Sequence, residues 1–270
     1  MTAKGFLVIC FSCGFGPISV YRAAFKAAGT RILREVQYAP ETTDPGPVVD
    51  PMLESGADIL CWCSSYAPMV HALTEYAYAK GFQGQIISCT MDGYDRLAAR
   101  TSPEFMEGVV FQFPDFDDPM PREKAFFFNR PHVYFAEYNR RFPETWSAVS
   151  WEYVAMLDIW HSAVEKTGSV ATLSVLAAMK QLGHVTHAFG HADWWGEEIF
   201  GISNALIGDW PVVTVQDSKA RIAAFKSIPD WLAAHSGLLK SELAALGQLW
   251  HQRLESGGPG GQVSSRAVQG

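Results

Sequence analysis

The sequence predicts an α/β fold in which helices cover both faces of a parallel β-sheet. Over the first 115 residues, short apolar runs alternate with segments of helical periodicity. This alternation is typical of strand–helix–strand crossover units, which produce parallel sheets. Glycine and proline residues stand at several points where one element should end and the next begin. Beyond about residue 116 helical patterns dominate, which predicts a second, mainly helical part.

The first part should alternate strands and helices. The predicted strands are short runs rich in apolar residues, at 6–11, 31–36, 57–63, 85–90 and 108–113. The predicted helices place apolar residues three or four positions apart, at 17–28, 48–53 and 68–80. In the first helix Pro17 suits the first turn and Gly29 the end, whereas Pro51 weakens the second helix. In the strand at 57–63, Cys61 and Cys63 should share one face.

The pattern of apolar residues changes at the start of the second part. Pro114, Pro119 and Pro121 interrupt the periodicity together with several acidic residues, as is typical of a segment that crosses between lobes. Helical patterns follow at 126–141, 145–166, 172–182 and 228–254, with strand-like pieces at 198–202 and 211–216. The apolar stripe of the helix at 145–166 consists of Trp146, Val149, Tyr153, Leu157, Trp160 and Val164.

Composition excludes several classes of protein. Hydrophobic residues make up 48% of the 270 residues and charged residues 18%, so the chain is not intrinsically disordered. No apolar run approaches the ~20 residues that a membrane-spanning helix needs. The net charge of −7 argues against a nucleic-acid partner, because binding to the phosphate backbone requires clustered basic residues. Five cysteines, without a dense pattern, do not predict a disulfide scaffold.

The two ends of the sequence carry no targeting signal that we recognise. The apolar run at 6–11 is too short for the core of a secretion signal, and Gly14 and Gly16 follow it, so we interpret it as a buried strand. Residues 255–270 are rich in glycine and serine, which predicts a disordered tail.

The cysteines allow two interpretations. Cys10 and Cys13 lie between a strand and a helix, where a thioredoxin-like redox pair would stand. No tryptophan precedes the first of them, so packing is the simpler interpretation and a thiol oxidoreductase is a lesser alternative. Cys61 and Cys63 are likewise expected as small core residues rather than zinc ligands.

A histidine cluster does not predict a metal site. His184, His187 and His191 have the spacing of metal ligands only if their segment is helical. Gly183 and Gly190 favour a loop or a hairpin instead. Neither a complete dinucleotide-binding glycine motif nor a Gly-x-Ser-x-Gly elbow is present. The sequence therefore predicts neither an enzyme nor a cofactor.

Three side chains follow the ends of predicted strands: Phe15 after the first, Tyr66 after the third and Asp92 after the fourth. Ligands bind at the carboxyl ends of strands in open α/β sheets. Two aromatic rings and a carboxylate would suit a small cationic or amino-bearing molecule. Each residue also has an ordinary role, because Phe15 can be a core residue, Tyr66 a surface ring and Asp92 a turn former.

Several short stretches occur in a characteristic order and spacing: GFG at 14–16, YAPETTD at 38–44, ESGADILC at 54–61, AKGF at 79–82, MDG at 91–93, FAEYNRRF at 135–142, YVA at 153–155 and AVEKTGS at 163–169. With them, residues 4 to about 216 resemble the type I periplasmic solute-binding proteins of ABC transporters, in the leucine-binding-protein-like family for branched-chain amino acids and amides. The resemblance implies a two-lobed α/β fold that binds a ligand in the cleft between the lobes.

The resemblance also implies which residues bind the ligand. The family's aromatic residue after the first strand of the second lobe matches Phe15, and its tyrosine before x-Pro matches Tyr66. The acidic residue that pairs with the ligand amine matches Asp92. Trp151, at the start of a first-lobe helix, is a looser match.

The sequence departs from the family at its start, because it begins where the family's second lobe begins. The implied domains are a second lobe at 1–115 with a returning strand at about 205–216, a mainly helical remnant of the first lobe at 116–204, a C-terminal helical extension at 217–254 and the tail at 255–270. Without the first half of the first lobe, helices within 121–182 should expose apolar faces, to which a partner chain or a second copy could bind.

The function implied by the resemblance is that of a non-catalytic solute-binding component of an ABC importer. Its partners would be a small amino acid, amide or related metabolite and a membrane permease, and its location would be the periplasm. The alternative is a cytoplasmic regulator that senses a ligand on the same fold, which the lack of a recognised secretion signal favours.

Overall fold

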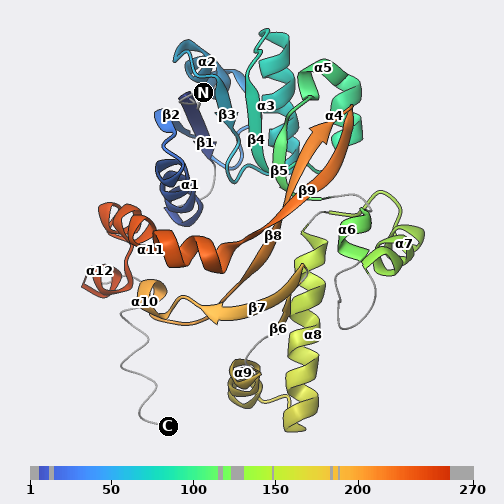
Figure 1. Cartoon of the computed structure of the whole chain (residues 1–270), viewed down its shortest axis with the longest axis vertical. Coiled ribbons are helices and arrows are strands. Elements are labelled where there is room, and N and C mark those ends of the chain that lie inside the picture. The colour runs from blue at the N-terminus through green and yellow to red at the C-terminus, as the bar shows by residue number, and fades with distance from the viewer. Residues whose placement is uncertain are drawn as a thin grey trace.

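The computed structural model describes residues 6–11, 15–114, 118–122, 131–147, 149–182, 185–187 and 189–255. The molecule is elongated (Figure 1). An α/β part at one end is called the upper lobe here, and a mainly helical part at the other end the lower lobe. A long antiparallel strand pair runs between them. The tail predicted at 255–270 lies outside the described residues from position 256 onward.

In the part of the chain that the structure describes, the upper lobe contains five parallel strands in the order β2-β1-β3-β4-β5. They are β1 (Phe6–Phe11), β2 (Arg31–Gln37), β3 (Ile59–Cys61), β4 (Gln85–Thr90) and β5 (Val110–Phe113). The helices are α1 (Phe15–Ala27), α2 (Gly46–Glu54), α3 (Ala67–Ala79), α4 (Tyr94–Arg100) and α5 (Pro103–Met106). The predicted strands and helices of this part are all confirmed, whereas α4 and α5 were not predicted.

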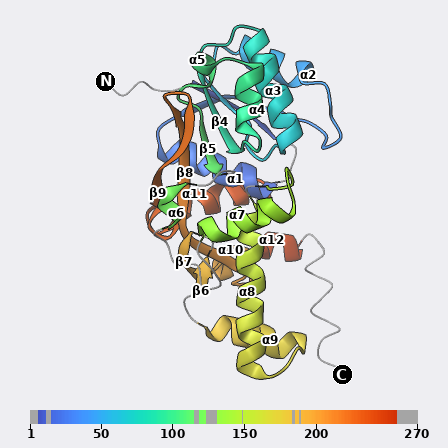
Figure 2. The same ribbon diagram turned by 90° about the vertical axis from the view of Figure 1, so that its right-hand side faces the viewer.

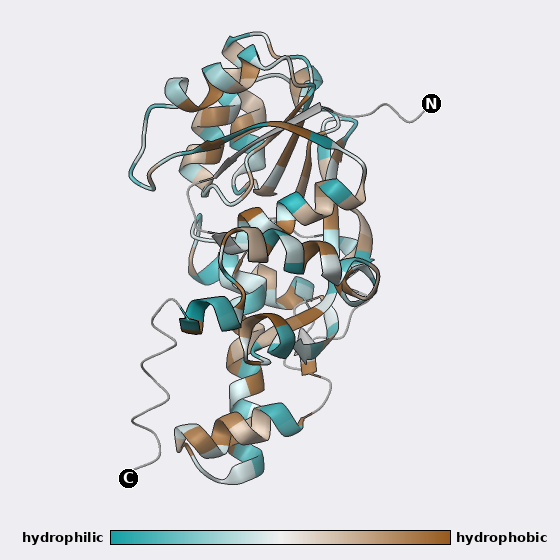
Figure 3. Cartoon of the chain, turned by 90° about the vertical axis from the view of Figure 1, so that its left-hand side faces the viewer, coloured by the Kyte–Doolittle hydropathy of each residue, from teal (hydrophilic) through white to brown (hydrophobic). Residues whose placement is uncertain are grey.

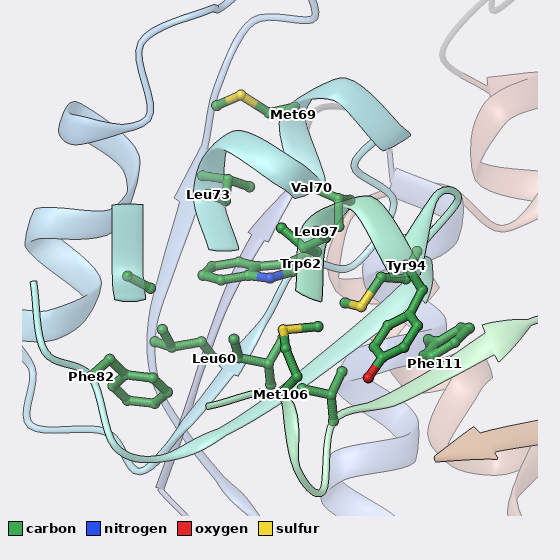
Figure 4. Close-up of a cluster of buried hydrophobic side chains, with 14 of the residues drawn as sticks. Leu60, Trp62, Met69, Val70, Leu73, Phe82, Tyr94, Leu97, Met106 and Phe111 are labelled. Carbon is green, nitrogen blue, oxygen red and sulfur yellow. The ribbon is translucent and has the colours of Figure 1, made fainter. Parts of the chain in front are cut away.

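Side chains alternate between the two faces of the sheet along β3 and the two residues after it, and each face has its own apolar cluster. Leu60 and Trp62 point into the main core, which α2 to α5 cover (Figure 4). Cys61 and Cys63 point to the opposite face, where they pack with Ile18 of α1. The predicted common face of the two cysteines is therefore confirmed, and their role is that of buried core residues.

One long strand belongs to both lobes. The second half of β8 (Ala205–Gln216) pairs with β5, and its first half pairs with β7 (Gly190–Trp195). Its neighbour β9 (Lys219–Ser227) runs back along most of its length. The two-residue turn between them, Asp217 and Ser218, has positive φ angles, and the Glu107 carboxylate accepts hydrogen bonds from both backbone amides. β8 spans the positions at which a returning strand is expected from the sequence, about 205–216.

The lower lobe contains α6 (Pro119–Arg122), α7 (Pro131–Arg141), α8 (Ser150–Thr167), α9 (Thr172–Gln181), β6 (Val185–His187) and α10 (Glu197–Phe200). Figure 2 shows α8 as the long helix of this lobe, with α9 at its far end. β6 and β7 form an antiparallel hairpin, as the glycines around the histidines predicted. None of the described helices combines the length and the apolar character that crossing a membrane requires.

Three predictions of secondary structure are corrected. The segment at 217–254 is not wholly helical, because β9 precedes α11 (Ile228–Ala245) and α12 (Trp250–Glu255). The strand predicted at 198–202 is the short helix α10, which Gly196 and Gly201 delimit. The helix predicted from residue 145 begins at Ser150. The helix predicted at 126–141 is described only from Pro131, because residues 123–130 lie outside the described part.

Candidate ligand-binding site

A cavity of about 410 Å³ lies between the two lobes. It opens at the carboxyl ends of β3 and β4, where the loops that follow these strands meet the segment before α8. Residues 64–68, Cys89, Thr90 and Asp92 line it from the upper lobe, and Ser147 and Val149 line it from the lower lobe. Hydroxyl groups, a thiol, an aromatic ring and a carboxylate therefore face one space.

Tyr66 reaches the cavity because the chain turns sharply after β3. Cys63 has a positive φ of 35°, a conformation that non-glycine residues adopt seldom, and Ser65 donates its backbone amide to the carbonyl of Trp62. Tyr66 then stands directly before α3, whose second residue is Pro68. Its hydroxyl donates to the Pro40 carbonyl at 2.8 Å, and its side chain is 45% exposed. The ring is thus held at the edge of the cavity and remains partly exposed.

Asp92 occupies the turn between β4 and α4, and two neighbours fix its position. The following residue, Gly93, has a φ of 75°, a left-handed conformation that favours glycine. The carbonyl of Asp92 lies 2.6 Å from Nε2 of His71 on α3. Nδ1 of the same ring lies 2.7 Å from Nη2 of Arg100. Because Arg100 can only donate, Nδ1 is the acceptor, and Nε2 carries the ring hydrogen that is donated to the Asp92 carbonyl. Burial lowers the pKa of His71, which favours this neutral form.

The carboxylate of Asp92 connects the two lobes. Its Oδ2 accepts a hydrogen bond of 2.8 Å from the hydroxyl of Ser147, which lies 55 positions further along the chain. A hydrogen bond to a charged acceptor is stronger than one between neutral groups. This contact therefore favours the arrangement in which the lobes stand close together.

The structure brings together two of the four predicted binding residues, Tyr66 and Asp92. Phe15 is the first residue of α1, but its side chain lies outside the described part. Trp151 is buried, with 3% of its surface exposed, and donates its indole N–H to the Pro114 carbonyl at 3.1 Å. It packs in an aromatic cluster with Tyr134, Phe135, Trp146 and Phe189. Trp151 thus belongs to a buried aromatic cluster and is not among the described residues that line the cavity.

Sequence reasoning missed the lower-lobe side of the cavity. Ser147 and Val149 line it immediately before α8, in a segment that the apolar stripe from Trp146 onward assigned to the helix. Cys89 and Thr90 were overlooked although they end a predicted strand next to Asp92. Among the described residues, no group of His, Cys, Asp and Glu side chains is arranged to hold a metal ion. Cys13 and His184, named above as candidates, lie outside the described residues.

Comparison with known proteins gives one family and a set of solved structures. The family model described as periplasmic binding protein matches residues 14–220. A leucine-binding protein from Thermotoga maritima is 16% identical with a TM-score of 0.61, and the match covers 84% of this chain and 61% of that one. No curated protein sequence matches the chain.

Two solute-binding proteins of ABC transporters have the same fold. One, from R. palustris in complex with benzoate, is 10% identical with a TM-score of 0.61, and the match covers 83% of this chain and 59% of that one. The other, from Rhodopseudomonas palustris in complex with p-hydroxybenzoic acid, is 16% identical with a TM-score of 0.60, over 84% of this chain and 62% of that one. The chain therefore spans less than two thirds of the length of these solved chains. The predicted type I periplasmic-binding fold is confirmed.

Proposed function

The chain belongs to the periplasmic binding protein family, and on this ground we propose that it binds a small solute in the cavity between its lobes as the binding component of an ABC importer. The observation that carries the proposal is the meeting of Tyr66 and Asp92 from neighbouring parallel strands with Ser147 from the other lobe. Family members are non-catalytic binding proteins, and we extend this to the chain. The family also supports the periplasm as its location and a membrane permease as its partner.

The proposed mechanism is closure of the lobes on the ligand. The β8–β9 pair joins the lobes and can act as the hinge, while a ligand that contacts both Asp92 and Ser147 favours the closed state. A cavity of about 410 Å³ is within the size range of small-molecule sites. The site therefore has room for a ligand of the size of an amino acid or a substituted benzoate.

The chemistry of the lining favours a ligand that carries an N–H or O–H donor. Asp92 can accept from an ammonium, an amide or a phenol, and the open face of Tyr66 can pack against an apolar or cationic group. The hydroxyls of Ser65 and Thr90 can bond to the acceptor end of the same molecule. We accordingly propose an amino acid, an amide or a related metabolite, and a hydroxylated aromatic acid as a second class.

Calorimetry with leucine, leucinamide, 4-hydroxybenzoate and benzoate tests this proposal. We expect saturable binding of at least one donor-bearing compound, and Asp92→Asn should weaken it about 10- to 100-fold because a charge-assisted hydrogen bond is lost. Asp95→Asn, on the exposed side of α4, removes the same charge and should leave binding unchanged. Absence of saturable binding to all four compounds, or an equal loss in both variants, would contradict the proposal.

Removal of the Ser147 hydroxyl tests the closure mechanism. Ser147→Ala deletes the hydrogen bond that joins the lobes in this structure. If opening of the lobes breaks this bond, its loss corresponds to about 1 kcal/mol, or roughly a fivefold change in the open–closed ratio. Single-molecule FRET between dyes on α3 and α9 should show a larger open population, whereas Ser203→Ala in the lower lobe should match the wild type. An unchanged FRET distribution in Ser147→Ala would show that this contact does not hold the lobes together.

A further inference from the structure

The long helix of the lower lobe is apolar on both of its faces. Its inner face packs against the β6–β7 hairpin and the aromatic cluster through Trp151, Ala155 and Ile159, which are all buried. Its opposite face also carries large apolar side chains, but these are exposed; we call them the outer α8 face, which consists of Tyr153 (69% exposed), Met156 (43%), Leu157 (67%) and Trp160 (45%). A helix that is apolar all round is normally covered on all sides.

Among the described residues, α9 covers the C-terminal continuation of the outer α8 face. Ala163 and Val164, one turn beyond Trp160, pack against Val175 and Ala178 of α9. The preceding turns have no such cover among the described residues. Further apolar side chains, Leu173 and Leu176 of α9, are exposed nearby in sequence, and Figure 3 shows hydrophobic segments along the helices of this end of the molecule. The outer α8 face is therefore the open part of a packing surface that continues under α9.

The outer α8 face also lacks charge. Asp158 and Glu165 lie on the side of the helix away from Tyr153 and Trp160. Glu152, one turn before Met156, has a buried carboxyl oxygen. Aromatic residues and methionine are typical of the buried centre of protein interfaces. A partner recognised by opposite charge would find no counterpart here.

We propose that the outer α8 face binds the same face of a second copy of this chain. An apolar surface is complementary to itself, which is what a two-fold symmetric contact requires. The four side chains together expose on the order of 500 Å², so two copies would bury about 1,000 Å², the size that a specific interface needs. Two antiparallel copies of α8 place Leu157 of each copy against Trp160 of the other, with both Leu157 side chains close to the symmetry axis.

Sedimentation velocity on the full chain between 1 and 100 μM tests the proposal. The wild type should be a dimer, and Leu157→Glu should weaken the dimer at least 30-fold because it places a charge at the centre of the contact. Val133→Glu makes the same change at an exposed apolar residue of α7, with 40% exposure, and should remain dimeric. Far-ultraviolet circular dichroism of both variants should equal that of the wild type, and a loss of ellipticity in Leu157→Glu moves the test to Tyr153→Glu.

A charge-complementation experiment separates a two-fold dimer from unspecific adhesion. Leu157→Glu and Leu157→Lys should each be monomeric alone and should form a mixed dimer when combined, because the two positions lie close together across the axis. Large heterogeneous aggregates that both variants leave unchanged would overturn the proposal. A monomeric wild type at 100 μM would also overturn it, and would favour instead a further polypeptide segment over α8, since the solved chains of this fold are longer. Neither outcome bears on ligand binding in the cavity.

Discussion

Replacement of Trp62 by alanine is expected to lower the free energy of unfolding by about 3–5 kcal/mol, the range for truncation of a large buried aromatic residue. Trp62 is fully buried, and its indole N–H donates to the Thr74 hydroxyl at 3.0 Å. Leu60, Leu97 and Met106 surround it in the main core of the upper lobe (Figure 4). A cavity at this position would separate α3 and α4 from the sheet.

Urea denaturation followed by circular dichroism measures this loss. Trp62→Phe is the matched control, because it keeps an aromatic ring in the core. It removes the hydrogen bond to Thr74 but only part of the side-chain volume. Thr74 also donates to the Val70 carbonyl at 2.7 Å, so its hydroxyl keeps one partner in both variants. The phenylalanine variant should lose about 1–2 kcal/mol. A loss below 1 kcal/mol in Trp62→Ala would show that the upper lobe can repack around the missing ring.

The upper sheet was predictable because its signals are local. Each strand is an apolar run closed by turn residues. Along β3 and the two residues that follow it, the alternation of Leu60, Cys61, Trp62 and Cys63 indicated which residues face which helix layer. The meeting of Tyr66 and Asp92 was predictable for a related reason. The carboxyl ends of neighbouring parallel strands lie at one edge of a sheet, so residues that follow such strands approach one another whatever their distance in sequence.

The lower lobe was less predictable because its elements depend on tertiary contacts. β9 contains three alanines, which have little strand preference. The segment is a strand because it pairs with β8 along its length, a contact that its composition does not indicate. α8 has apolar residues on both faces, so periodicity could not decide whether Trp151 or Tyr153 faces the interior. Ser147 carries no sequence signal for the site, since its role arises only from a contact with Asp92 across the two lobes.

Between pH 4.5 and pH 8, we expect Glu152 to lower the stability of the protein as the pH rises. Glu152 lies in the first turn of α8, and its Oε1 is buried without a hydrogen-bond partner among the described residues. Burial raises the pKa of its carboxyl group to about 7. In an unfolded chain the pKa of glutamate is about 4.3.

The sign of this effect follows from the protons bound in each state. Between the two pKa values the folded protein keeps a proton that the unfolded chain has released, so the free energy of unfolding falls as the pH rises and levels off above the folded-state pKa. The raised pKa corresponds to a loss of about 3 kcal/mol by pH 8. Burial also raises the pKa of Asp158 to about 6, which acts in the same direction, whereas the lowered pKa of His71 acts in the opposite direction.

The contribution of Glu152 is isolated by comparing pH dependences rather than single stabilities. Glu152→Gln keeps the shape of the side chain and stays neutral, so it should match the wild type near pH 4.5 and exceed it by about 2–3 kcal/mol at pH 8. Glu165→Gln, at an exposed position of the same helix, should follow the wild-type curve. Because the titrations of Asp158 and His71 are common to all three proteins, they cancel in the difference. Parallel curves for Glu152→Gln and the wild type would mean that the Glu152 carboxylate is charged in the folded protein and that its surroundings stabilise that charge.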